Sequence, residues 1–124
     1  MNTQRTQQRQ GDVLVVPVDS IPAEAKPADR DNIDRIVLAL GEASGHAHAI
    51  RDRDVVAFRM ETAEQDVNRA MVDFIMVGGG GAKLAHEYDS GKKAEHDTLE
   101  LAPGAYRVVQ QREYSPEELR RVAD

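Results

Sequence analysis

The chain has 124 residues, a formal net charge of −6 and no cysteine. This length fits a single domain with a modest core. Because cysteine is absent, disulfides, thiolate nucleophiles and cysteine-bound zinc or iron–sulfur centres are excluded, and any metal ion would bind to His, Asp or Glu. The acidic balance argues against a nucleic-acid-binding surface. No run reaches the roughly 20 apolar residues of a membrane span, so we expect no membrane association and a cytoplasmic protein.

Residues 1–10 are almost entirely polar and are expected to form a disordered tail, followed by a single β-rich domain over residues 11–124. The apolar run 12–18 predicts the first strand. Pro17 within it indicates an edge position or a strand end, because proline donates no hydrogen bond to a sheet. Residues 19–32 combine prolines and charges without a period and predict a surface loop.

The segment 34–50 is interrupted by Gly41 and Gly45, which favours two strands or one strand bent at a bulge. The run 54–60 predicts the next strand, and together these segments suggest an antiparallel meander. Residues 62–72 differ, because a capping-box pattern precedes apolar residues at helical spacing. They predict a short helix.

Residues 73–77 predict a strand, Gly78–Gly81 a hairpin turn and residues 82–89 the returning strand. The glycine run does not fit a phosphate-binding P-loop, because no Ser or Thr follows Lys83. We therefore interpret the four glycines as a turn.

Two further strands are predicted at residues 97–101 and 105–114, where polar and apolar residues alternate. On the second of them Tyr106 and Gln110 share a face. Residues 115–124 begin with serine and proline at helix-start positions and predict a closing helix. The whole pattern predicts a mainly β fold, either a small antiparallel barrel or a β-sandwich, with one or two short helices.

Two histidines, His46 and His48, stand one residue apart directly after an apolar run. On a strand their side chains would share a face, with Cβ atoms about 7 Å apart, so both imidazoles could reach one ion at roughly 2.1 Å. His86 and His96 are distant in sequence, and a small barrel could bring them to the same place. The sequence therefore predicts a divalent metal site, for zinc, manganese, iron or nickel, on His46, His48, His86 and His96.

The same residues have other interpretations. An H-x-H pair is weak evidence on its own, and incidental surface or core histidines are a close alternative, with metal-free acid–base chemistry the third. If a metal supports catalysis, Glu87 or Glu95 is the candidate general base. Arg112 is a candidate for binding a substrate carboxylate or phosphate, although an ion pair within the chain is the more frequent use of an arginine.

Four motifs resemble those of a small, uncharacterised bacterial family: GHAH at residues 45–48, EH at 95–96, GAYRVVQQREY at 104–114 and RRVAD at 120–124. The resemblance covers residues 11–124 and implies no established activity. It selects four residues for testing: His46, His48, His96 and Arg112.

A second similarity is to cupins. GEASGHAH at residues 41–48 is similar to the first cupin motif, and APGAY at 102–106 to the turn of the second. This similarity implies a barrel-like architecture and part of a metal-ligand set. The chain departs from the cupin pattern because Asp52 and Asp54 stand where a glutamate is expected, and no histidine follows Gly104.

Three classes of function remain open. The leading one is a small metal-binding protein whose reaction and substrate the sequence does not name. The second is a metal-free interaction or assembly module, in which the histidines are incidental and exposed edge strands, with residues 111–121, bind a protein partner or a second copy. The third is a metal-independent, histidine-dependent hydrolase.

Overall fold

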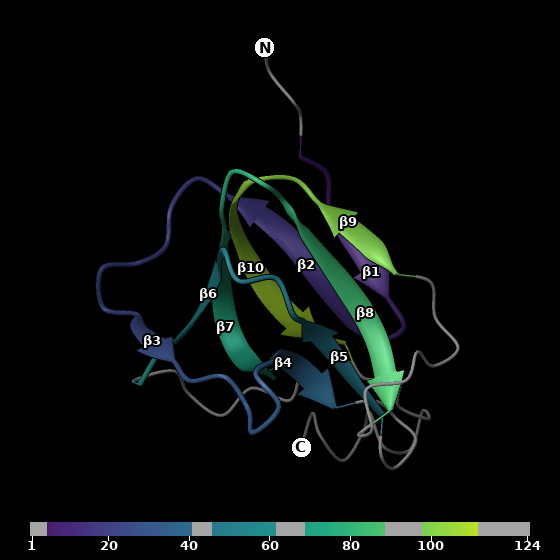
Figure 1. Ribbon diagram of the computed structural model, residues 1–124. Coiled ribbons are helices and arrows are strands. Elements are labelled where there is room, and N and C mark those ends of the chain that lie inside the picture. The colour runs from purple at the N-terminus through teal and green to yellow at the C-terminus, as the bar shows by residue number, and fades with distance from the viewer. Residues whose placement is uncertain (1–4, 41–45, 62–68, 89–97, 112–124) are drawn as a thin grey trace, which may run out of the picture.

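The computed structural model describes residues 5–40, 46–61, 69–88 and 98–111. These residues form two antiparallel β-sheets packed face to face, and no helix occurs among them (Figure 1). The smaller sheet lies in front of the larger one in this view, and neither closes on itself. The mainly β prediction is confirmed, and the architecture is a sandwich rather than a closed barrel. The described part of the chain has no helix long and apolar enough to cross a membrane.

The larger sheet has six strands in the order β1-β2-β10-β7-β6-β3. Its strands are β1 (Gln8–Gln10), β2 (Val13–Val18), β3 (Lys26–Ala28), β6 (Val55–Arg59), β7 (Arg69–Val77) and β10 (Gly104–Gln110). Both edge strands are short, and β3 contains Pro27, which limits pairing with another sheet. The loop predicted over residues 19–32 therefore includes one edge strand.

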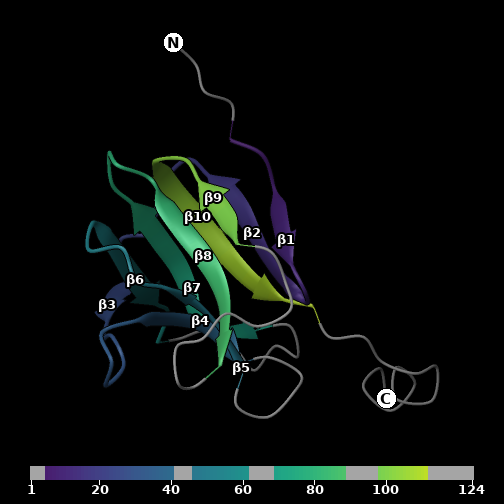
Figure 2. The same ribbon diagram turned by 45° about the vertical axis from the view of Figure 1, so that its right-hand side comes forward.

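The smaller sheet has four strands in the order β4-β5-β8-β9. They are β4 (Ile36–Leu40), β5 (His46–Ile50), β8 (Ala82–Tyr88) and β9 (Leu99–Leu101). The segment 34–50 thus contains two antiparallel strands, with a bulge between Val37 and Ala39. Figure 2 shows β5 and β8 from a second direction, at the centre of this sheet.

The core lies between the sheets and consists of aliphatic side chains from both. Burying one such side chain contributes about 1.5–3 kcal/mol. Along β10, Tyr106 and Val108 are buried while Arg107 is exposed, which confirms the predicted alternation. The Tyr106 hydroxyl donates a 2.6 Å hydrogen bond to the Ala102 carbonyl. Burial raises the pKa of Tyr106, and the neighbouring Arg5 partly offsets this effect.

The helix predicted over residues 62–72 is wrong for its last part, because residues 69–72 belong to β7. There Arg69 pairs with Val109 of β10, and Ala70 and Val72 are buried in the core. Pairing in a central strand outweighs a local helical spacing of a few residues. Residues 62–68 and the closing helix predicted over residues 115–124 lie outside the described residues.

The hairpin predicted at Gly78–Gly81 is also wrong, because the two strands that it joins lie in different sheets. β7 pairs with β6 and β10, whereas β8 pairs with β5 and β9. Gly81 has a φ of 74°, which favours glycine, and a Cβ atom on Gly78 would lie 1.9 Å from an Asp54 carboxylate oxygen. The turn instead carries the chain across the sandwich. The predicted antiparallel meander is wrong for the same reason, because β5 and β6 lie in different sheets.

The tail predicted over residues 1–10 is wrong for its second half. Gln8–Gln10 form β1 against β2, and Gln10 is buried. Arg5 donates hydrogen bonds to the carbonyl oxygens of Val18, at 3.0 Å, and Ala105. β1 pairs only with residues 13–15 of β2, so Pro17 has β10 alone as a neighbour. Pro17 therefore has the edge position that was predicted.

Candidate functional site

Three of the four predicted histidines come together in the smaller sheet. His46 and His48 lie on β5, and His86 lies on β8 directly opposite His48. The ring centres of His48 and His86 are 4.5 Å apart with an interplanar angle of 16°, so these rings stack. The rings of His46 and His86 are 5.2 Å apart and nearly perpendicular, at 77°. His96 lies outside the described residues.

The histidines point into the space between the two sheets. Ile50 and Leu84, two positions further along the same strands, are completely buried in the core, and alternate residues of a strand share a face. His48 and His86 are only 2% and 4% exposed, whereas His46 is half-buried. The cluster thus reaches from the interior toward the start of β5.

Gln10 fixes the orientation of the His48 ring. Its amide nitrogen donates a 2.8 Å hydrogen bond to the Leu84 carbonyl, which can only accept. The amide oxygen of Gln10 must therefore be the atom 2.8 Å from His48 Nδ1. It follows that Nδ1 carries a hydrogen and donates it to Gln10.

Asp12 and Gln110 extend the polar contacts of His48. The Nε2 atom of His48 lies 3.7 Å from the Asp12 Oδ1 atom. The Gln110 amide nitrogen donates to Asp12 Oδ2 at 3.1 Å and to the Leu40 carbonyl at 3.0 Å. Among the described residues, every buried side-chain nitrogen and oxygen has a hydrogen-bond partner. The sandwich therefore contains a polar chain that runs from one sheet to the other.

Sequence reasoning missed Gln10 and Asp12, because the first was assigned to the tail and the second to the start of a strand. One available signal was Gly11 between them, since glycine between polar residues indicates a turn. The chain does turn at Gly11, which has a φ of 58°. For Gln110, the alternation along β10 already indicated the same face as buried Tyr106.

The ring geometry determines which pair of histidines could bind one metal ion together. Imidazole lone pairs lie in the ring plane, so the parallel rings of His48 and His86 do not converge on one ion. Two imidazoles on one tetrahedral ion have ring centres roughly 5 Å apart, given a metal–nitrogen distance of about 2.1 Å. The 5.2 Å between His46 and His86 matches this separation. Within the described residues, no three His, Asp or Glu side chains form a group that could hold an ion.

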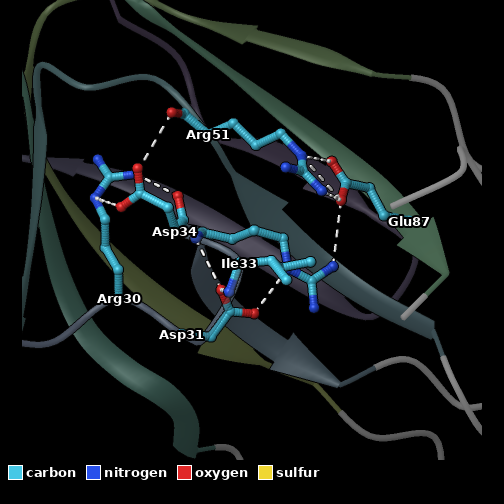
Figure 3. A network of polar contacts seen from close by, with 7 residues as sticks. Arg30, Asp31, Ile33, Asp34, Arg51 and Glu87 are labelled. Carbon is cyan, nitrogen blue, oxygen red and sulfur yellow. Dashed lines mark hydrogen bonds and ion pairs between the residues drawn. The ribbon is translucent and has the colours of Figure 1, made fainter. Parts of the chain in front are cut away.

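Glu87 lies on the other face of the sheet from the histidines. It is opposite Ala47 in register and follows His86, so it points outward. Its carboxylate accepts hydrogen bonds from Arg35 at 3.2 Å and from Arg51 at 3.0 Å (Figure 3). The structure therefore does not bring this candidate base to the histidines. Glu95 and Arg112 lie outside the described residues.

The loop before β4 extends the outer network. Asp31 accepts hydrogen bonds from the backbone N–H groups of Ile33 and Arg35 and from the Arg35 guanidinium at 2.8 Å (Figure 3). Burial raises the pKa of Asp31, but these hydrogen bonds outweigh burial and hold the pKa below its usual value. The hydrogen bond to Glu87 raises the pKa of Arg51. The outer network thus consists of guanidinium and carboxylate groups, whereas the polar contacts of His48 combine the Gln10 amide with the Asp12 carboxylate.

Comparisons with known proteins identify a family without a described activity. Residues 9–111 match the family model described as "Domain of unknown function (DUF8820)". A search of the curated proteins and a search of the solved structures both find no match. The similarity to an uncharacterised family is thereby supported, whereas the similarity to cupins is not.

Proposed function

The chain belongs to the DUF8820 family, a domain of unknown function, and we propose that it binds one divalent metal ion through a histidine cluster built on His46 and His86. The observation that carries this proposal is the 5.2 Å, nearly perpendicular arrangement of these two rings. Histidines separated by 39 intervening residues meet there without distortion of either strand. Because cysteine is absent, no thiolate competes with imidazole for the ion.

A third ligand is required, and we assign this part to His96. It follows Tyr88, the last residue of β8, by eight positions, and eight residues can span up to about 26 Å. This length permits a return to His86. Three imidazoles would suit zinc, and also manganese, iron or nickel, and would leave a coordination position for water.

His48 is assigned a positioning role in this proposal. It stacks on the face of His86 and is itself held by Gln10. Metal-binding histidines are usually oriented by a further contact, and a fixed stacking partner limits rotation of the His86 ring. That His48 is itself a ligand stays a prediction.

A bound ion would supply Lewis-acid chemistry or an activated water. The chain's own residues would hold and orient it, and the core would keep His86 dry. Glu87 is bound by two arginines on the opposite face, so the general base of a catalytic site would have to be another group, and Glu95 stays the predicted one. The substrate class is open.

Elemental analysis tests the proposal. The purified protein is expected to contain about one equivalent of metal, and His46→Ala and His86→Ala are expected to lose it. Lys26→Ala, on the exposed strand β3, is the control and should retain it. A metal-free protein whose melting temperature responds neither to added zinc nor to a chelator would contradict the proposal.

An interaction module is the second candidate, and the outer face of β6 and β7 favours it. There Val56 is opposite Met76, and Phe58 is opposite Phe74. Val56 and Met76 are 46% and 40% exposed, although both are large and apolar. Sedimentation equilibrium tests for a second copy on this face: a dimer that Val56→Thr/Met76→Thr abolishes would support it, and a monomer at about 1 mM would contradict it.

The metal-independent hydrolase stays a prediction. The described arrangement does not favour His48 for this role, because its Nδ1 atom is bonded to Gln10, its Nε2 atom faces Asp12 at 3.7 Å, and its 2% exposure leaves little access for a substrate.

A further inference from the structure

A hollow of about 390 Å³ lies on the outer face of the smaller sheet, away from the histidines. It is lined by Ala49, Arg51, Asp52, Lys83, Ala85, Glu87 and Thr98. Ala49 and Ala85 are opposite one another in register, at the centre of β5 and β8. Ala85 is half-buried and contributes a single methyl group to the apolar floor of the hollow, whereas Ala49 is completely buried. The volume is at the small end of the range for ligand pockets.

Lys83 supplies a cation at this hollow. Its side chain is exposed, and in the described part of the chain its ammonium group forms no hydrogen bond or ion pair. Glu100 is opposite Lys83 on β9, yet the two do not form an ion pair among the described contacts. The Lys83 backbone N–H, by contrast, is bonded to Asp52 Oδ1 at 2.9 Å. The strand is thus fixed while the charged end of the side chain is available.

Arg51 supplies a second, pre-oriented cation. Its Nε and Nη2 atoms bind Glu87, which fixes the plane of the guanidinium, and Nη1 has no hydrogen bond within the described residues (Figure 3). Glu87 also binds the buried Arg35 guanidinium, so its negative charge is shared by two cations. An anion near Arg51 therefore meets less repulsion from Glu87 than a single ion pair would give.

We propose that this hollow binds a small organic anion, a carboxylate or a phosphate ester, whose short apolar part lies on the methyl group of Ala85. The anionic group contacts Lys83 and the free edge of Arg51, and the Thr98 hydroxyl adds a hydrogen bond. Charge-assisted hydrogen bonds of this kind are short and strong, and a fixed guanidinium is well suited to them. The site is independent of metal binding, because it lies on the opposite face of the same strands.

Amide chemical shifts of the full chain, recorded by NMR during titration, test the proposal. The probes are sodium butyrate and methyl phosphate, with butylamine hydrochloride and sodium chloride as references at the same ionic strength. We expect saturable shifts at residues 49–52, 83–87 and 98 with at least one of the two anions, and the one that binds identifies the anionic group. Shifts that only follow ionic strength, or tighter binding of butylamine, would overturn the proposal.

Two variants locate the site. Lys83→Met should weaken anion binding about tenfold or more, and Ala85→Leu should abolish it by filling the hollow. Lys26→Met is the matched control, because it removes an ammonium group on the other sheet. Equal affinity in Lys83→Met and in the unchanged protein would overturn the proposal. Since Lys83 is exposed, its substitution tests the proposal even if Ala85→Leu fails to fold.

Discussion

The two faces of the smaller sheet use the same two strands for different chemistry. On the inner face His48 and His86 are stacked, and the amides of Gln10 and Gln110, together with the Asp12 carboxylate, complete the polar contacts. On the outer face, one residue along β8, Glu87 is held by two guanidinium groups. On both faces the buried polar side chains of the described residues have hydrogen-bond partners, mainly amides on the inner face and guanidinium groups on the outer face.

The largest effect is expected at Glu87. Glu87→Gln removes the charge that compensates Arg35, which is buried, and Arg51. Breaking a buried ion pair by removing one partner costs about 3 kcal/mol, so the free energy of unfolding in urea should fall by this amount. Glu100→Gln is the control on the same face, where no ion pair to the described residues exists. A loss below about 1 kcal/mol at Glu87 would mean that the outer network contributes little.

Gln10 tests the inner face, with a smaller expected loss. Gln10→Ala leaves the Leu84 carbonyl and the His48 Nδ1–H group without this partner. Unsatisfied buried groups cost about 1–3 kcal/mol, so we expect a loss of about 2 kcal/mol in the same measurement. Gln111→Ala, at an exposed glutamine that accepts a hydrogen bond from Arg9, should change stability by less than about 0.5 kcal/mol. Equal losses of unfolding free energy in Gln10→Ala and Gln111→Ala would contradict the structural role assigned to Gln10.

Acid should act on the outer network through Asp31. Its pKa in the folded protein is lowered from 3.8, so the unfolded chain binds the proton more tightly and stability rises with pH in this range. The contribution is present above about pH 4 and is lost as the pH falls through the lowered pKa. Urea unfolding at a series of pH values should show a shallower acid dependence in Asp31→Asn. An unchanged slope would contradict the assignment.

The smallest effect is expected at Arg53, whose side chain is 87% exposed and lies 3.1 Å from Asp34. Exposed ion pairs contribute about 0–1 kcal/mol. Arg53→Ala should therefore leave the unfolding midpoint almost unchanged. A loss comparable with that of Glu87→Gln would mean that geometry alone, and not burial, determines the strength of these ion pairs.

Strand alternation was sufficient to predict much of the site. It placed His46 and His48 on one face and Tyr106 and Gln110 on another shared face. Applied to neighbours, the same rule separates His86 from Glu87, so the distance of this candidate base from the histidines was predictable. Alternation along a strand shows which residues share a face, and this part of the site can be predicted from neighbouring residues in the sequence.

Strand partners could not be predicted in the same way. The runs before and after Gly78–Gly81 suggested a hairpin, but β7 and β8 pair with strands from distant parts of the chain. Residues 69–72 have helical spacing and still form a strand, because β7 is central in its sheet. Gln10 was missed for a related reason, since its burial depends on pairing between β1 and β2. Such pairings are decided by the packing of the whole sandwich.

The most direct test of the metal proposal follows the imidazole nitrogens by NMR while zinc is added. We predict that nitrogen signals of His46 and His86 shift and saturate at about one equivalent, while the Nδ1–H signal of His48 persists because Gln10 still accepts its hydrogen bond. Unchanged His46 and His86 signals with excess zinc, or a metal-induced shift confined to His48, would contradict the account.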